Sequence, residues 1–524
     1  MLRELKWKLL RFIRLNASNA KFGLFIVLLV LTTLLYAYLN ASDSVIIAFN
    51  NGHLNNVDKL EMDVKIYDHD GPHQFKGKKI VHLDLKGAPP KLSYYKPFFS
   101  IMASLGVDGI LMEYEDMFPY SGSMEVIRRE EAYTNEEIET IKRWAEEKNL
   151  ELIPLVQTFG HLEFVLKHDK FSSLSEIPKP RRAICPSNHQ SLVMLKELID
   201  QVMTSHPHTK YFHVGGDEVY ELAKCAKCKE HNLSRKEIYV RHVIAVYKYI
   251  KSKWPNVNVL FWEDMIRTWT IPEMEKLKGL VPMVWAYRRN LDDAFPDNMW
   301  ENYEKVFQTV WIASAFKGAL APDNDLVPID YHTSNHLSWM KIIKFYQKIK
   351  FEGIAVTGWS RFDHYQPLCE LLPAGIPSLA LCIGILNFGN LNNQLVRKVS
   401  NAFRCQKNIS LSFSFQDYIQ EKCHFPGSKT FAIISKWKVI YSDLMVLRRF
   451  FNDPMGYHVY KDKAILAEPK KSIRELDQRI NAFIPEATLA LNEIYYPNTV
   501  NEWVASKKKA AKDLLISLQQ YSSN

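Results

Sequence analysis

Short apolar runs rich in β-branched and aromatic residues recur along the chain from about residue 79. Longer stretches with helical spacing separate them, such as Asn135–Asn149 with its acidic first turn. This alternation is typical of βα units around a parallel sheet. The runs predict strands at Ile80–Leu85, Gly109–Tyr114, Leu152–Gln157, Tyr211–Gly215, Val257–Trp262, Pro282–Trp285, Thr309–Ala313 and Gly353–Trp359.

Eight successive units of this kind predict an α/β fold, a (β/α)8 TIM barrel, over residues 77–387. The alternative is an open doubly wound sheet, which needs a glycine-rich phosphate turn after its first strand. That position holds Gly87-Ala-Pro-Pro90, which is poorly suited to cradle a phosphate. Residues 388–524 are predicted to form a mainly helical C-terminal region, because helical spacing covers Phe431–Phe451, Ser472–Tyr495 and Glu502–Tyr521.

The start of the chain has a different pattern. Phe22–Leu39 is apolar and uncharged, close to the ~20 residues that a membrane-spanning helix needs. It is longer than the apolar part of a secretory signal peptide, although Ala37 and Ala41 leave cleavage possible. Basic residues precede it and few follow, which predicts a cytoplasmic tail (1–21), a transmembrane signal-anchor helix (22–39) and a stalk (40–76). We therefore expect a single-pass type II membrane protein with its catalytic domain in the lumen of the secretory pathway or outside the cell.

Composition supports a folded domain, with 47% hydrophobic and 24% charged residues. Much of the net charge of +9 lies in residues 1–21, so a nucleic-acid partner has no support. The glycosylation triplets Asn232-Leu-Ser234 and Asn408-Ile-Ser410 agree with a lumenal location.

The seven cysteines are odd in number, so at least one is free or pairs with another chain. Cys225-Ala-Lys-Cys228, with His231 nearby, is one ligand short of a structural zinc site. A lumenal compartment favours a local disulfide here, and two unpaired thiols or a metal site are the alternatives.

In TIM barrels the active site lies at the C-terminal ends of the strands. Carboxylates, imidazoles and aromatic rings follow several of the predicted strands. Singly, each is as well explained by core packing or by a helix N-terminus, but their shared position favours one site. Aromatic rings stack on sugar rings and carboxylates bind hydroxyls, so a carbohydrate substrate is expected.

The run His213-Val-Gly-Gly-Asp-Glu218 resembles the His-x-Gly-Gly-Asp-Glu signature of the family 20 β-N-acetylhexosaminidases. The likeness extends from about Ile80 into the helical C-terminal region and is similar to the hexosaminidase D branch of that family. The segments that carry it are Val81–Pro90, Glu113–Tyr120, Pro154–His161, Ala313–Gly318 and Glu370–Gly375. The resemblance implies a retaining exo-enzyme that removes terminal β-linked N-acetylhexosamine, GalNAc or GlcNAc, from glycans. In such enzymes the 2-acetamido group of the substrate is the nucleophile.

By this resemblance, Glu218 protonates the leaving oxygen and later deprotonates water, while Asp217 holds the acetamido N–H and offsets the positive charge of the intermediate. Adjacent residues of an extended chain point to opposite sides, which suits two separate tasks. His161 is expected to orient the catalytic acid. The charge of Asp217 is expected to raise the pKa of Glu218.

The resemblance also implies a set of substrate-binding residues: Trp285, Trp359 and Trp262 as aromatic walls, Tyr287 at the acetamido oxygen, and Asp363 and Glu113 at sugar hydroxyls. The arginine that many members place near the first strand has no match, and Lys86 stands nearby instead. No cofactor and no metal are expected.

Two other functions remain open on the sequence alone. One is a catalytically silent, membrane-anchored barrel that binds glycans. The other is a metal-dependent barrel hydrolase, which is disfavoured because no His-x-His pair follows the first strand.

Overall fold

The computed structural model describes residues 74–411, 422–452 and 463–523. The chain divides into two units, Met1–His69 and Asp70–Asn524, and all described residues belong to the second. The predicted tail (1–21), membrane helix (22–39) and nearly all of the predicted stalk (40–76) lie outside the described residues. Among the helices of the described residues, none is both long and apolar enough to cross a bilayer.

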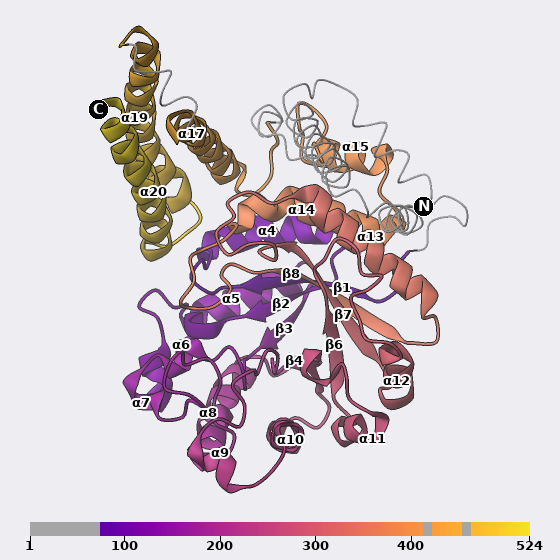
Figure 1. Cartoon of the computed structure of the whole chain (residues 1–524). Coiled ribbons are helices and arrows are strands. Elements are labelled where there is room, and N and C mark those ends of the chain that lie inside the picture. The colour runs from indigo at the N-terminus through magenta and orange to yellow at the C-terminus, as the bar shows by residue number, and fades with distance from the viewer. Residues whose placement is uncertain (1–73, 412–421, 453–462, 524) are drawn as a thin grey trace, which may run out of the picture. The chain divides into compact units, whose positions relative to one another are not determined.

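Eight strands form a closed barrel in which every strand is parallel to its neighbours, and β8 pairs with β1 to close the ring (Figure 1). All eight predicted strands are confirmed, and closure excludes the open doubly wound sheet. The strands are β1 Lys78–Asp84, β2 Gly109–Glu113, β3 Glu151–Leu155, β4 Tyr211–His213, β5 Asn258–Trp262, β6 Val281–Trp285, β7 Val310–Lys317 and β8 Phe351–Gly358.

Helices follow the strands and surround the barrel (Figure 1). The helices of the barrel part are α4 Leu92–Leu105, α5 Asn135–Glu146, α6 Glu163–Leu166, α7 Asp169–Ser172, α8 His189–Ser205, α9 Ala226–Glu230, α10 Arg235–Lys253, α11 Ile271–Met274, α12 Met299–Val306, α13 Ile329–Phe345 and α14 Leu372–Phe388. Short 3-10 turns are η1 Glu115–Met117, η2 Gly122–Ile127, η3 Asp264–Ile266 and η4 Glu275–Leu277. The predicted helix at Asn135–Asn149 corresponds to α5, whose start is fixed by a capping box between Thr134 and Glu137.

Beyond the barrel, α15 Asn393–Ala402 is followed by three long helices, α17 Ser428–Asn452, α19 Lys463–Asn492 and α20 Pro497–Ser523. The mainly helical C-terminal region is thus confirmed in the described residues. The three long helices pack on one another, and α17 also contacts α14 (Figure 1). The loop before α4 is joined to the loop before α20, because the Lys91 N–H donates to the Ile494 carbonyl and Pro90 pairs with Tyr495.

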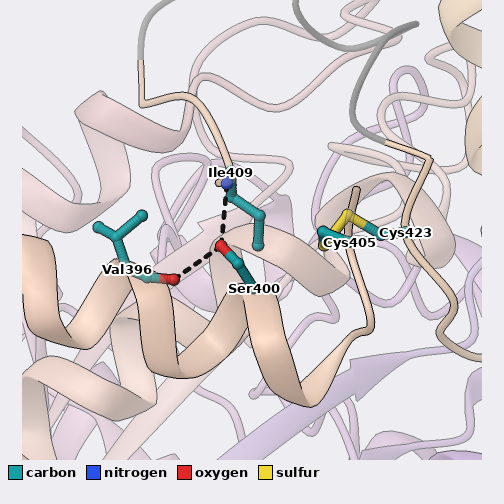
Figure 2. The surroundings of a disulfide bond; sticks show 5 residues. All are labelled: Val396, Ser400, Cys405, Ile409 and Cys423. Atoms are coloured by element: carbon teal, nitrogen blue, oxygen red, sulfur yellow. Dashed lines mark hydrogen bonds between the residues drawn. A yellow bond between two sulfur atoms is a disulfide. The ribbon is translucent and has the colours of Figure 1, made fainter. Parts of the chain in front are cut away.

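A disulfide between Cys405 and Cys423 joins the segment after α15 to the segment before α17. Figure 2 shows that Ser400 Oγ, beside it, donates to the Val396 carbonyl (2.7 Å) and accepts from the Ile409 N–H (2.9 Å). The other five cysteines are free: Cys185, Cys225, Cys228, Cys369 and Cys382. The favoured local disulfide between Cys225 and Cys228 is therefore wrong for this structure.

Candidate active site

The sharp turn after β4 brings the Asp217–Glu218 pair to the C-terminal rim of the barrel. Two glycines make this turn, with φ of 67° at Gly215 and 98° at Gly216, a region that side chains rarely adopt. A Cβ on Gly215 would also overlap the amide oxygen of Gln157. These two positions explain why β4 ends at His213, earlier than predicted.

His161 contacts both carboxylates. Its Nε2 lies 3.5 Å from Asp217 Oδ2 and 3.4 Å from Glu218 Oε2. His161 and Glu218 have left-handed φ values of 52° and 50°, which cost a residue other than glycine about 1–3 kcal/mol. Such strain is retained where the surrounding structure requires a particular side-chain position. The structure thus brings together the three residues that the sequence predicted as catalytic.

The backbone and side chain of Glu218 are held from two further sides. The Glu218 N–H donates to Asp264 Oδ2 (3.0 Å), and the Tyr220 hydroxyl donates to Glu218 Oε1 (3.3 Å). Asp264 Oδ1 also accepts from the indole N–H of Trp285 (3.3 Å). Asp264 was not predicted as a site residue. Its position two residues after the end of β5 was a usable signal.

The two adjacent carboxyls have opposite pKa shifts. Burial raises the pKa of Asp217 to about 8, and the charges of Asp264 and Glu218 act in the same direction. The hydrogen bond from His161 lowers the pKa of Glu218 below its ordinary value. The expectation that Asp217 raises the pKa of Glu218 is therefore wrong for the ligand-free site, because it did not include the cation beside both groups.

Burial acts to lower the pKa of His161, but Asp217 and the hydrogen bond to Glu218 outweigh it and raise that pKa to about 10. The raised pKa favours the charged imidazole, which donates a hydrogen bond to Glu218 and lies 3.5 Å from Asp217.

A cavity of about 220 Å³ opens beside the pair. Trp285 and Tyr287 form one stacked aromatic wall, with ring centroids 5.3 Å apart, and Trp359 also lines the cavity. The lining residues are Lys86, Gln157, His161, Asp217, Glu218, Trp285, Tyr287, Gly318, Ala319, Trp359, Arg361 and Phe362. The cavity thus combines flat apolar faces with a few charged groups, an arrangement that suits a sugar ring.

Comparisons with known proteins agree with this site. The family model described as glycosyl hydrolase family 20, catalytic domain, matches residues 113–306. Hexosaminidase D of Bos taurus is 40% identical over 346 residues, which cover 64% of this chain and 99% of that protein. Hexosaminidase D of Homo sapiens is 35% identical over 461 residues, which cover 84% of this chain and 93% of that protein.

The chain belongs to glycosyl hydrolase family 20. It is accordingly a glycosidase. A solved β-N-acetylhexosaminidase from Bacteroides fragilis is also similar, with a TM-score of 0.46 and 15% identity over 64% of this chain and 71% of that one. That likeness is too weak to add to the relatives above.

Three of the residues predicted to bind substrate in this family 20 chain do not line the cavity. Trp262 is buried inside the barrel, against the rings of His213 and Trp359. Its indole N–H is buried without a hydrogen-bond partner among the described residues. Trp262 therefore meets the cavity only through its contact with Trp359.

The other two, Glu113 and Asp363, are carboxylates that already have side-chain or backbone partners. Glu113 is fully buried, 2.9 Å from His82 Nε2, and accepts from the Gln157 amide (3.1 Å). Asp363 accepts from Arg182 (2.9 Å) and from the Tyr365 N–H (2.7 Å). Neither carboxylate lines the cavity.

Arg361 is a cavity-lining cation that the sequence analysis of this family 20 chain missed. Glu502, from α20, accepts two hydrogen bonds from its guanidinium (2.6 and 2.7 Å). Arg361 packs against Gly87, where a Cβ would overlap the guanidinium, so the turn after β1 must be glycine to admit it. Arg361 follows β8 and thus brings a guanidinium group to the turn after β1.

Lys86, noted in the sequence because it stands where an arginine was expected, does line the cavity. It is buried between Asp84 (3.8 Å) and Glu115 (3.2 Å), which together with further carboxylates outweigh burial and raise its pKa. Among the described residues, the cluster of side chains suited to hold a metal lies outside this cavity.

Proposed function

We propose that this family 20 chain is a retaining exo-β-N-acetylhexosaminidase in which the acetamido group of the substrate attacks its own anomeric carbon. The hexosaminidase activity is supported by the family and by relatives named hexosaminidase D. One observation carries the mechanism: the carboxylates that line the cavity among the described residues are Asp217 and Glu218, and both contact the same nitrogen of His161. A conventional retaining glycosidase places its two carboxyls about 5–5.5 Å apart on either side of the scissile bond. An adjacent pair joined through one histidine fits a mechanism whose nucleophile comes from the substrate.

Asp217 is suited to bind the acetamido group. Its side chain is only 10% exposed, and Oδ1 is buried with no hydrogen-bond partner within the described part of the chain. An acetamido N–H donated to this oxygen would satisfy it and would favour the ionised form. The resulting carboxylate would offset the positive charge of an oxazolinium intermediate.

Glu218 is suited to move the proton. Its side chain is 37% exposed and therefore reaches the open side of the cavity, where a leaving group departs. In the first step the acetamido oxygen bonds to C1, the glycosidic bond breaks, and Glu218 transfers its proton to the leaving oxygen. In the second step Glu218 takes a proton from water, the water oxygen bonds to C1, and the oxazolinium ring reopens to the acetamide.

The pKa shifts of the pair bear on how the acid becomes protonated. Burial raises the pKa of Asp217 to about 8 and so favours its protonated form. Donation of the acetamido N–H to Asp217 favours the ionised carboxylate, and a sugar over Glu218 removes water from it and raises its pKa. Substrate binding therefore moves the shared proton toward the residue that needs it.

The size of the cavity favours removal of one terminal sugar. Its volume of about 220 Å³ is below the roughly 300–1,000 Å³ typical of pockets for drug-sized ligands. Trp285 and Trp359 would contact the apolar faces of the sugar and acetamido group, with Tyr287 at the acetamido oxygen. Arg361 and Lys86 would bind hydroxyls. The substrate class is terminal β-linked N-acetylhexosamine, GalNAc or GlcNAc.

The cellular location is proposed from the sequence alone. The basic residues 1–21 and the apolar residues 22–39 favour a type II anchor, with the enzyme acting on glycans in the lumen or outside the cell. Protease protection of the catalytic domain in sealed microsomes is the expected result.

Proton NMR of the reaction on aryl β-GlcNAc and aryl β-GalNAc tests the enzymatic proposal. The β-anomer should appear first, and Glu218→Gln should lower kcat by roughly 10²–10⁴ while preserving inhibitor binding. Glu304→Gln, at an exposed position of α12, is the matched control. Initial release of the α-anomer would overturn the retaining mechanism. If neither sugar is hydrolysed, the chain is a glycan-binding barrel instead.

A further inference from the structure

Four side chains able to bind metal meet behind the catalytic rim. Glu176 and Cys185 come from the loop between β3 and α8, and Cys225 and Cys228 come from the loop after β4. One ligand atom from each lies within 4.8 Å of the others. Cys185, Cys228 and Glu176 are buried and Cys225 is partly buried. Cys185 and Glu176 thus lie beside the Cys-x-x-Cys pair, and His231 is not part of the cluster.

The distances match a tetrahedral site. Cys185 Sγ is 3.3 Å from Cys225 Sγ and 3.7 Å from Cys228 Sγ. Glu176 Oε2 is 3.4 Å and 3.2 Å from the same two sulfurs of Cys225 and Cys228. A zinc ion at about 2.3 Å from sulfur and about 2.0–2.2 Å from oxygen separates tetrahedral ligands by roughly 3.5–3.8 Å. The four distances given above lie within about 0.5 Å of that range, and all four ligand atoms lie within 4.8 Å of one another.

The backbone holds the ligands in place. Glu176 and Cys185 lie on opposite strands of a small hairpin, because the Glu176 N–H donates to the Ala183 carbonyl (2.9 Å) and the Cys185 N–H donates to the Leu174 carbonyl (2.7 Å). Glu176 Oε1 accepts from the N–H groups of Lys224 (2.5 Å) and Cys225 (2.9 Å). Its other oxygen is thereby directed at the sulfurs, as ligand-orienting contacts do in metal sites.

We propose that Glu176, Cys185, Cys225 and Cys228 bind one zinc ion with a structural role. Three sulfurs and one oxygen favour zinc over magnesium or calcium, which prefer oxygen ligands alone. Four protein ligands leave no open position for a substrate or water, as is usual for structural zinc.

The charge balance of the cluster also favours a cation. A buried carboxylate facing three thiols has only weak S–H donors on that side. A zinc ion would displace the protons of the ligating thiols, and its binding should therefore strengthen as pH rises.

The site would fasten the two loops that carry the catalytic residues. In the hairpin, the Ile184 N–H donates to the Phe159 carbonyl (3.0 Å) and Arg182 donates to Asp363 (2.9 Å). The Leu162 N–H, next to His161, donates to the Arg182 carbonyl (2.9 Å). Cys225 follows Glu218 in the same loop. The ion would act on the active site only through the positions of these loops.

The experiment is elemental analysis of the full chain, purified under reducing conditions without chelator. One zinc per chain is expected in the wild type, and little or none in Cys228→Ser. Glu176→Gln should retain the fold and bind zinc more weakly. Cys382→Ala, which removes a buried free cysteine of α14, is the control and should keep one zinc.

A second measurement keeps the proposal testable if the cysteine variant fails to fold. Zinc is removed from the wild type with chelator, and Co²⁺ is then added. Sulfur-to-cobalt charge-transfer absorption and a rise in the melting temperature are expected. Absence of both zinc and cobalt uptake would overturn the proposal, as would a Cys185–Cys225 disulfide found by mass spectrometry of the native protein. These readouts do not use hydrolysis, so failure of the zinc site is distinct from failure of the proposed function.

Discussion

At the scale of single residues, His161 lies beside two carboxyl groups that have different environments. It contacts both, but Asp217 is 10% exposed and Glu218 is 37% exposed. The more buried carboxyl loses more hydration, which raises the pKa of Asp217. The hydrogen bond from His161 lowers the pKa of the more exposed Glu218.

The pH dependence of kcat/KM should reflect one proton shared by this pair. Activity is expected to fall as pH rises through about 8, where Asp217 loses its proton in the ligand-free enzyme. In Asp217→Asn the descending limb of the residual activity should move to lower pH, because the remaining acid, Glu218, has a lowered pKa. Initial rates with an aryl substrate from pH 4 to 10 measure both profiles. If the descending limb stays near pH 8 in the variant, the proton whose loss lowers activity belongs to a group other than Asp217.

The sequence was sufficient to predict that Asp217, Glu218 and His161 lie together, because each follows a recognisable strand and lies in a distinctive motif. It was not sufficient for the direction of the Glu218 shift, which depends on burial and on the His161 cation. The same limit of the sequence applies to the predictions for Trp262, Glu113 and Asp363. Their positions after strands were predictable, but whether each side chain faces the cavity depends on tertiary packing.

At the scale of elements, the turn after β4 places the pair, and its glycines are the sensitive positions. Gly215→Ala should lower the free energy of unfolding by about 1–3 kcal/mol more than Gly122→Ala, and should also lower activity. Both positions have a positive φ, but a Cβ at Gly122 meets open space and one at Gly215 meets Gln157. Urea denaturation of both variants gives the comparison, and equal losses of stability would show that no steric overlap exists.

Strands and long helices were predictable because their periodic patterns are local. The contacts between loops were less predictable. Cys185 and Cys225 are 40 residues apart, and the hairpin that brings Cys185 to the cluster has no periodic signal. A single sequence indicates where loops occur, but it does not indicate which loops pack against one another.

At the scale of the whole molecule, the C-terminal region contributes to the cavity. Glu502 of α20 binds Arg361, and the nearby Thr499 hydroxyl donates to the Gly87 carbonyl (2.8 Å). The helical character of this region was predictable from its spacing. Its contact with the active site was not, because Arg361 and Glu502 lie in different predicted domains.

Glu502→Gln should raise KM for aryl hexosaminides up to about tenfold, with a smaller change in kcat, because Arg361 loses its charged partner. Glu493→Gln, which breaks an exposed ion pair with Lys429, is the control and should leave KM unchanged. Steady-state kinetics of the two variants provide the test. An unchanged KM in Glu502→Gln would mean that Arg361 is positioned without help from α20.

The central claim is that the acetamido oxygen of the substrate is the nucleophile. The most direct measurement compares kcat/KM for an aryl β-glycoside carrying an N-acetyl group with that for the same glycoside carrying N-fluoroacetyl, N-difluoroacetyl or N-trifluoroacetyl. Each fluorine withdraws electron density from the amide oxygen and weakens it as a nucleophile. We predict that kcat/KM falls steeply with every fluorine added. A kcat/KM that does not depend on the number of fluorines would contradict the mechanism.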